Sequence, residues 1–279
     1  MLIYEIIKVI VLGIVEGITE WLPVSSTGHM ILLDEFIHLN VSEEFMSMFL
    51  VVIQVGAILA VPVLFRDKLN PISRKKSKYE RKTVLQIWGR VLVGSIPAAV
   101  LGFLLDDLLD KYLYNYFVVA IALIVYGIIF IFIEKSRAER KHKVENLEAL
   151  TYKDAIKIGA FQSLSLIPGT SRSGSTILGG MLIGASREVS AEFSFFMAIP
   201  VMLGASLLKT AKFLLSGFTA TKDELLLLLF GITVSFIVSL AVIRFLMDYV
   251  KRHSFRAFGI YRIFLGIIVV SYFLFKTLA

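Results

Sequence analysis

Residues 13–29, GIVEGITEWLPVSSTGH, place two carboxylates, a proline and a cluster of hydroxyls inside an otherwise apolar segment. Pro23 predicts the end of a helix, because the residue before a proline is pushed away from helical angles. In lipid, the backbone groups of such a break must be buried in protein or line a wet cavity. We therefore expect residues 2–39 to form a re-entrant hairpin of two helices. The alternative is an ordinary first span over residues 2–22.

A second copy of this pattern lies at residues 159–176, GAFQSLSLIPGTSRSGST, within the apolar segment 153–186. In both copies a proline follows the opening glycine within about ten residues and leads into a serine-rich turn. Downstream, residues 44–57 and 192–205 both begin with Glu-Phe and end with Gly-Ala. The pattern predicts that the chain is built from two repeats, each opened by a hairpin.

Six further apolar runs are long enough for transmembrane helices, which need about 20 residues each. They lie at residues 44–65, 84–105, 113–133, 190–213, 225–247 and 258–277. Each repeat, 1–133 and 153–279, then holds one hairpin and three spans, and this odd number inverts the second repeat relative to the first. We expect an all-α integral membrane protein: a single domain of six transmembrane helices and two re-entrant helical hairpins that meet near the midplane. Residues 134–152 would be a cytoplasmic linker.

The composition of the 279-residue chain agrees with a membrane protein. Hydrophobic residues make up 57% and charged residues 18%, whereas soluble domains are about half apolar and a quarter charged. The net charge of +7 comes from basic residues between the apolar runs, so we do not expect nucleic-acid binding. The lack of cysteine excludes disulfides and cysteine nucleophiles. The first residues lack a basic n-region and a cleavage site, which predicts mature structure and not a signal peptide.

The charges of the connecting stretches predict the orientation. Residues 66–82 carry eight positive and two negative side chains, and stretches 134–157 and 251–256 are also basic. All three are expected in the cytoplasm, and the acidic stretch 106–111 is expected outside. The first hairpin then enters and leaves on the outer side, the second does so on the cytoplasmic side, and both termini lie outside.

The two breaks carry residue types suited to phosphate chemistry. Glu16 and Glu20 are four apart and project from one helix face, so they should share a polar cavity or a cation. Arg172 lies among hydroxyls and glycines, where a guanidinium can grip two phosphate oxygens. Ser26 and His29 have the spacing of a nucleophile and its base. Carboxylates would repel a bare phosphate, so we expect Glu16 and Glu20 to bind a divalent cation, Mg or Ca, that bridges a diphosphate.

Simpler explanations exist for these features. Intramembrane glutamates occur in proton-coupled transporters, and hydroxyls in membrane helices often bond to the backbone. An inverted repeat with broken helices is also typical of a secondary transporter or lipid flippase. The Ser-Arg-Ser cluster at residues 171–173 argues against these, because transport of a neutral solute does not need it. A purely structural scaffold would leave two carboxylates and an arginine unexplained. Trp21 is expected to anchor a span or to pack between helices.

Residues 16–29 and 168–176 resemble the two characteristic motifs of the BacA/UppP family of undecaprenyl-diphosphate phosphatases. These motifs are E-x-x-x-E followed by Ser and His, and P-G-x-S-R-S-x-x-T, and both match without a departure. The resemblance implies hydrolysis of undecaprenyl diphosphate to undecaprenyl phosphate and inorganic phosphate. This reaction recycles the lipid carrier of peptidoglycan synthesis, which cell wall biogenesis and cell shape require. It also implies resistance to bacitracin, which sequesters that lipid.

The resemblance further implies roles for individual residues. Catalytic roles would fall to Glu20, Ser26, His29 and Arg172. Substrate contacts would come from Glu16, Ser25, Thr27, Ser171, Ser173 and Thr176. Either the serine or a water would attack the terminal phosphorus, with His29 or Glu20 accepting the proton. The other class of membrane phosphatase, the type 2 phosphatidic-acid phosphatases, has a catalytic histidine soon after a Ser-Arg pair. The next histidine after Ser171-Arg172 is His253, far along the chain, so this class is excluded.

The expected partners are a prenyl diphosphate lipid and the surrounding membrane lipids, with a homodimer left open as the assembly state. The expected location is the inner or plasma membrane of a bacterium, crossed several times by the chain. The orientation inferred from the connecting stretches predicts a site that opens to the periplasmic or extracellular face.

Overall fold

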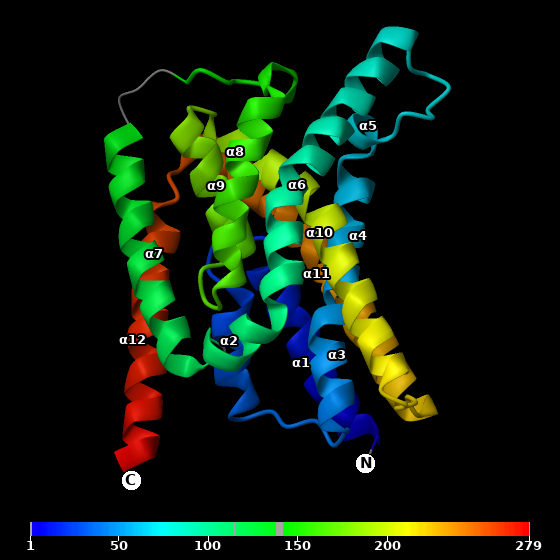
Figure 1. The fold of residues 1–279 in the computed structure, drawn as a ribbon, viewed down its shortest axis with the longest axis vertical. Helices are drawn as coiled ribbons and strands as arrows, with labels where there is room; N and C mark the ends of the chain where they lie inside the picture. The colour runs from blue at the N-terminus through cyan, green and yellow to red at the C-terminus, as the bar shows by residue number, and fades with distance from the viewer. Residues whose placement is uncertain (1, 114, 138–141, 279) are drawn as a thin grey trace.

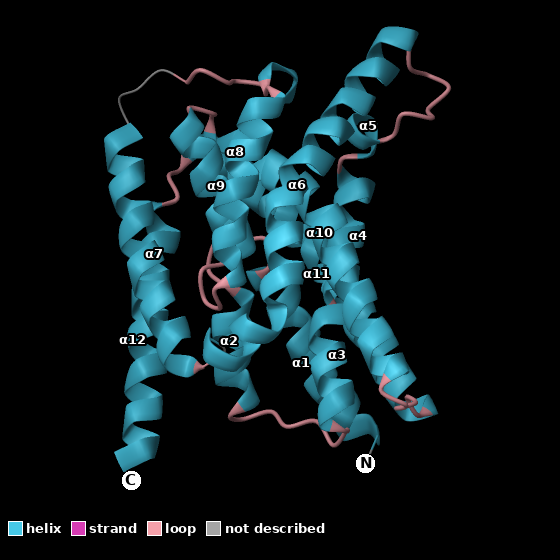
Figure 2. Cartoon of the chain, viewed as in Figure 1, coloured by secondary structure: helices cyan, strands magenta, loops and turns pink. Residues whose placement is uncertain are grey.

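The computed structural model describes residues 2–113, 115–137 and 142–278, and in this part of the chain every named element is helical (Figure 1, Figure 2). The first half contains α1 Leu2–Thr19, α2 Ser26–Asp34, α3 Glu43–Val52, α4 Gln54–Leu64, α5 Arg66–Leu69, α6 Lys78–Leu113 and α7 Tyr116–Arg137. The second half contains the 3-10 turns η1 Leu147–Ala149 and η2 Leu164–Leu166, and α8 Tyr152–Ser163, α9 Arg172–Ile183, α10 Arg187–Leu215, α11 Lys222–Arg252 and α12 Arg256–Leu278.

The six predicted transmembrane helices are confirmed, because six described segments are long and apolar enough to cross a membrane. They are Glu43–Leu64, Lys78–Leu105, Tyr116–Ser136, Arg187–Leu215, Lys222–Arg252 and Arg256–Thr277. The first of these is not one continuous helix, since it breaks at Ile53 between α3 and α4.

The boundaries of α6 differ from the sequence expectation. The helix begins at Lys78, inside the predicted basic loop, and runs on through the acidic stretch 106–111, which was expected to connect two spans. Hydropathy placed the end at residue 105, but residues 103–113 contain no glycine or proline that would stop a helix. The outward orientation of the acidic stretch stays a prediction.

Both predicted helix–break–helix segments are present. The first helix ends at Thr19 and α2 begins at Ser26, while α8 ends at Ser163 and α9 begins at Arg172. In Figure 1, α1 begins and α2 ends towards the end of the bundle that holds the termini. By contrast, α8 begins and α9 ends towards the opposite end. This antiparallel placement is what an inverted repeat requires. The repeat boundaries, the linker 134–152 (whose residues 138–141 lie outside the described part) and the depth of the hairpins in a bilayer stay predictions.

The chain termini and two of the basic connections lie at opposite ends of the bundle, and which end faces the cytoplasm stays a prediction. Both chain termini lie at the bottom in Figure 1, and the connections through residues 66–77 and 142–151 lie at the top.

Close helix approach brings the second hairpin against α6. A Cβ added to Gly159 would lie only 1.9 Å from the Gly94 carbonyl oxygen, so glycine is required at this contact.

Candidate active site

The second arm of each hairpin begins with a serine in the same unusual backbone conformation. Ser25 has φ 72° and Ser171 has φ 71°, values that a residue other than glycine rarely adopts. Their side chains accept hydrogen bonds from the backbone N–H groups of Gly28 at 3.3 Å and Gly174 at 3.1 Å. Strained backbone of this kind is concentrated at functional sites. The result is two capped helix N-termini, each with the partial positive charge that attracts anions.

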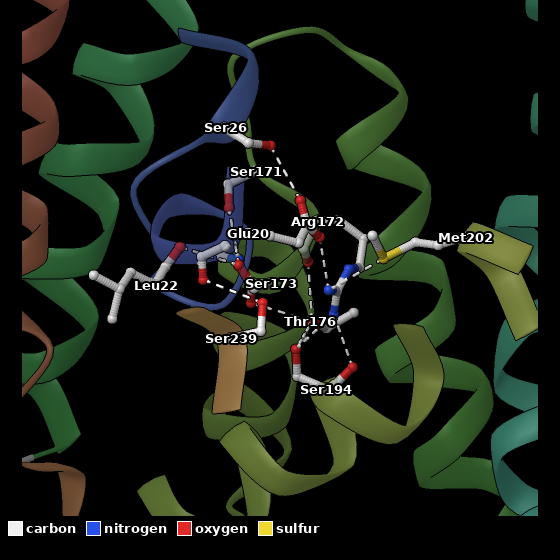
Figure 3. Close-up of polar contacts among 12 residues, drawn as sticks. Glu20, Leu22, Ser26, Ser171, Arg172, Ser173, Thr176, Ser194, Met202 and Ser239 are labelled. Carbon is white, nitrogen blue, oxygen red and sulfur yellow. Dashed lines mark hydrogen bonds and ion pairs between the residues drawn. The ribbon is translucent and has the colours of Figure 1, made fainter. Parts of the chain in front are cut away.

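A buried ion pair connects the two breaks (Figure 3). Arg172 Nη2 lies 2.8 Å from Glu20 Oε1, and the two side chains are 10% and 7% exposed. The other carboxylate oxygen, Oε2, accepts a hydrogen bond from Ser26 Oγ at 3.1 Å. The structure therefore brings together three of the predicted catalytic residues, which come from both hairpins.

The rest of the Arg172 guanidinium is held by groups that the motifs do not include. Nη1 donates to the carbonyl oxygen of Ser194 in α10 at 2.9 Å. The guanidinium also lies over the ring of Trp21, 5.5 Å from the ring centroid. Trp21 is fully buried and packs edge-on against Phe195. It packs between helices as expected, and it also forms one wall of the site by a cation–π contact.

The predicted hydroxyls of the second break form a network around this pair. Thr176 Oγ1 lies 2.6 Å from Ser194 Oγ and donates to the Arg172 carbonyl oxygen at 2.9 Å. Ser173 Oγ reaches the carbonyl oxygen of Leu22 at 3.3 Å, and so it links the second break to the first. Ser173 Oγ also lies 3.2 Å from Ser171 Oγ. Ser173 thus ties the two breaks together, and Thr176 ties α9 to α10.

His29 has a different partner from the one that its spacing suggested. Its Nδ1 lies 2.7 Å from the Ser25 carbonyl oxygen, and its Nε2 lies 2.6 Å from Tyr261 Oη. A carbonyl can only accept, so Nδ1 carries a proton, and in the neutral ring Nε2 accepts the hydrogen bond of the Tyr261 hydroxyl. His29 is thus turned towards α12, whereas the Ser26 hydroxyl points to Glu20. This geometry favours Glu20 over His29 as the base for Ser26.

Glu16 and Thr27 complete the predicted set. The Glu16 side chain is buried one turn before Glu20, and its Oε1 has no hydrogen-bond partner among the described residues. Thr27 is half-buried in the first turn of α2. Within the described part of the chain, no group of three or more His, Cys, Asp or Glu side chains is arranged to hold a metal ion. The protein alone would therefore offer a cation the two carboxylates Glu16 and Glu20.

Arg262 is the main residue that sequence reasoning missed. It is fully buried in α12 and donates to the carbonyl oxygens of Pro23 at 3.2 Å, Gly169 at 2.8 Å and Thr170 at 3.0 Å. The first of these carbonyls belongs to the first break and the other two to the second. An arginine within the apolar run 258–277 was the available signal, since a buried charge in a membrane helix needs a partner.

Fold and site together define a class: a polytopic membrane protein in which two broken helices meet at a buried ion pair of an arginine and a glutamate. The model of the family described as bacitracin resistance protein BacA matches residues 9–268, and the chain belongs to this family.

Relatives in several bacteria carry the name undecaprenyl-diphosphatase. The protein of Enterococcus faecalis is 56% identical over 276 residues, which cover 99% of this chain and 100% of the relative. That of Acetivibrio thermocellus is 57% identical over 97% of this chain and 98% of its own length. That of Streptococcus mutans is 55% identical over 100% of this chain and 99% of its own length. Nothing in these comparisons favours the transporter alternative.

Proposed function

We propose that this protein hydrolyses undecaprenyl diphosphate to undecaprenyl phosphate and inorganic phosphate. The observation that carries the proposal is the buried Arg172–Glu20 pair, set between two capped helix N-termini and in contact with the Ser26 hydroxyl. A buried arginine, helix N-termini and clustered hydroxyls are the groups that proteins use to bind phosphate. Relatives that match nearly the whole chain at 55–57% sequence identity are named undecaprenyl-diphosphatase.

Substrate binding would rearrange the ion pair. The guanidinium of Arg172 can take diphosphate oxygens in place of the Glu20 carboxylate, while the N–H groups at the starts of α2 and α9 face the remaining oxygens. Glu20 then keeps its hydrogen bond from Ser26 but loses its cationic partner. Its oxygen Oε2 then remains beside the Ser26 hydroxyl, in position to accept the proton of that hydroxyl.

The chemical step follows from this contact. Ser26 Oγ attacks the terminal phosphorus and passes its proton to Glu20, and the bond from that phosphorus to the bridging oxygen breaks. Undecaprenyl phosphate leaves, and water then hydrolyses the phosphoseryl group to release inorganic phosphate. Arg172 stabilises the charge that moves onto the transferring oxygens. His29, held by Tyr261, shapes the neighbouring wall of the site.

The site offers a divalent cation two carboxylates, and the substrate phosphates would have to complete its ligands. Glu16 has a buried carboxylate oxygen without a hydrogen-bond partner among the described residues, and Glu20 lies one turn further on. Mg²⁺ is commonly held by one or two carboxylates together with substrate phosphates, and it would supply charge neutralisation on the diphosphate. Chelation with EDTA should abolish phosphate release, and added Mg²⁺ or Ca²⁺ should restore it. Full activity in EDTA would contradict a role for the cation.

In the cell this reaction would recycle the lipid carrier of peptidoglycan synthesis, and it would protect against bacitracin by consuming the lipid that the antibiotic sequesters. We propose that the site opens to the outer face, because the basic connections lie at the other end of the bundle. The chain has no cysteine, so single-cysteine labelling can test this orientation. In intact cells an impermeant thiol reagent should label Asn40→Cys but not Lys75→Cys, and the reverse pattern would contradict the orientation.

The activity is tested with purified protein in mixed micelles that contain a long-chain prenyl diphosphate. Wild type should release inorganic phosphate, and rapid acid quenching should trap a phosphorylated protein that disappears in Ser26→Ala. A folded wild type that releases no phosphate with any cation would refute the function. An active Ser26→Ala protein would retain the function and assign the attack to water.

A further inference from the structure

An apolar groove of about 500 Å³ lies beside the first break, between α1 and α12. Its walls come from α1, the break and the start of α12, and include Val15, Ile18, Leu22, Val24, Ala257 and Phe258. The first helix packs on α11 whereas α12 packs on α7, so the groove follows the line along which these two helix pairs separate. It opens to the surface, because Ile18 and Ala257 are exposed. Its volume is in the usual range for small-molecule sites.

The few polar side chains along the groove are already paired. The Thr19 hydroxyl donates to the Val15 carbonyl oxygen at 2.7 Å, and His29 and Tyr261 bind each other at 2.6 Å. The groove therefore presents carbon surface to an occupant. A polar ligand would lose its hydration there without gaining hydrogen bonds in return, so the groove suits a hydrocarbon.

The groove lies next to the proposed phosphate site, on the other side of the first turn of α2. One turn of α2 carries both Ser26, whose hydroxyl points to Glu20, and His29, which lines the groove. Tyr261 stacks on the His29 ring, with the ring planes 9° apart, and lines the groove together with it. From there the groove extends to Ala257, one helical turn closer to the start of α12.

We propose that this groove binds the isoprenoid chain of the substrate, beginning at the unit that carries the diphosphate. The inference rests on the proposed function, since that function supplies a ligand with a diphosphate joined to a hydrocarbon chain. Burial of that chain contributes binding free energy in proportion to the apolar area removed from water. Long-chain substrates should therefore be favoured over short ones with the same head group, and filling the groove should remove the preference.

The test compares Ala257→Phe with Ala99→Phe, the same replacement at an exposed alanine of α6 away from the groove. Phosphate release is measured over a range of substrate concentrations, from a long-chain prenyl diphosphate in mixed micelles and from the water-soluble isopentenyl diphosphate in the same detergent. In Ala257→Phe, kcat/KM for the long-chain substrate should fall about tenfold, mainly through KM, while that for isopentenyl diphosphate is unchanged. Ala99→Phe should match wild type with both substrates.

Equal losses with both substrates would overturn the proposal, because the change would then act on the phosphate site. An unchanged long-chain KM in Ala257→Phe would overturn it as well.

If this variant does not fold, wild type is irradiated with a prenyl diphosphate that carries a diazirine in its first isoprene units. Label on peptides of α1 and α12 is expected; label elsewhere, or label removed by excess phospholipid, would overturn the proposal. Crosslinking does not need turnover, so a wild type that is labelled but releases no phosphate would refute the proposed function alone.

Discussion

Replacing Arg262 by methionine would remove the hydrogen bonds that tie the two breaks to α12. The guanidinium donates to three backbone carbonyls, those of Pro23, Gly169 and Thr170, and the side chain is fully buried. Methionine keeps the apolar stem but leaves these carbonyls without a donor. A buried carbonyl that loses its partner costs about 1–3 kcal/mol. Allowing for local relaxation, we expect a destabilisation of about 3–5 kcal/mol in total.

Two measurements on protein in detergent check this prediction. Thermal unfolding should show a Tm at least roughly 6 °C below wild type, since each 1 kcal/mol shifts the Tm of a protein of this size by about 2–4 °C. Phosphate release should also fall at a temperature where the variant is folded, because the starts of α2 and α9 are no longer held together. Arg244→Met, the same change at an exposed arginine of α11, is the control. An Arg262→Met protein with wild-type Tm and activity would refute the reasoning.

Three further predictions concern stability in the same thermal assay. The buried Glu134 carboxylate is bound in bidentate fashion by Arg187 and accepts a hydrogen bond from the backbone N–H of Phe255, just before α12. Glu134→Ala should therefore lower the free energy of unfolding by about 3–5 kcal/mol, and an unchanged Tm would contradict this. Ser171→Ala should lower Tm more than Ser171→Gly, because both lose the cap but only glycine relieves the positive φ; equal Tm values would argue against the strain. Gly159→Ala should lower Tm by forcing α8 away from α6. Gly204→Ala lies inside α10, where the added Cβ meets open space, so it should leave Tm unchanged or raise it by up to about 4 °C; similar Tm values for the two variants would rule out the close contact.

The sequence predicted the fold well where hydropathy and helix-breaking residues carry the information. Apolar runs located the six spans, and Pro23 and Pro168 located the two breaks. Helix ends outside the apolar runs were less accurate, as at α6, because hydropathy reports contact with lipid and not where a helix stops. The break at Ile53 has no comparable signal in the sequence.

The motifs identified residues that the fold brings together, but not how they pair, and their catalytic and binding roles stay predictions. Spacing suggested that Ser26 pairs with His29, yet Ser26 contacts Glu20, because the partner of His29 lies more than two hundred residues away in α12. Such a contact depends on tertiary packing, which local spacing does not contain. The same reason explains why Arg262 and Ser194 were missed, although both stand out as polar residues in apolar spans.

The central claim is that the two breaks act as one phosphohydrolase site, and a kinetic double-mutant cycle tests it most directly. Phosphate release from a long-chain prenyl diphosphate is measured for wild type, Glu20→Gln, Arg172→Gln and the double variant, all confirmed as folded. We predict an active wild type, a loss of at least about a hundredfold in each single variant, and a double variant no slower than the worse single, because residues that act as a unit are not additive. Losses that multiply in the double variant, or an inactive wild type, would contradict the account.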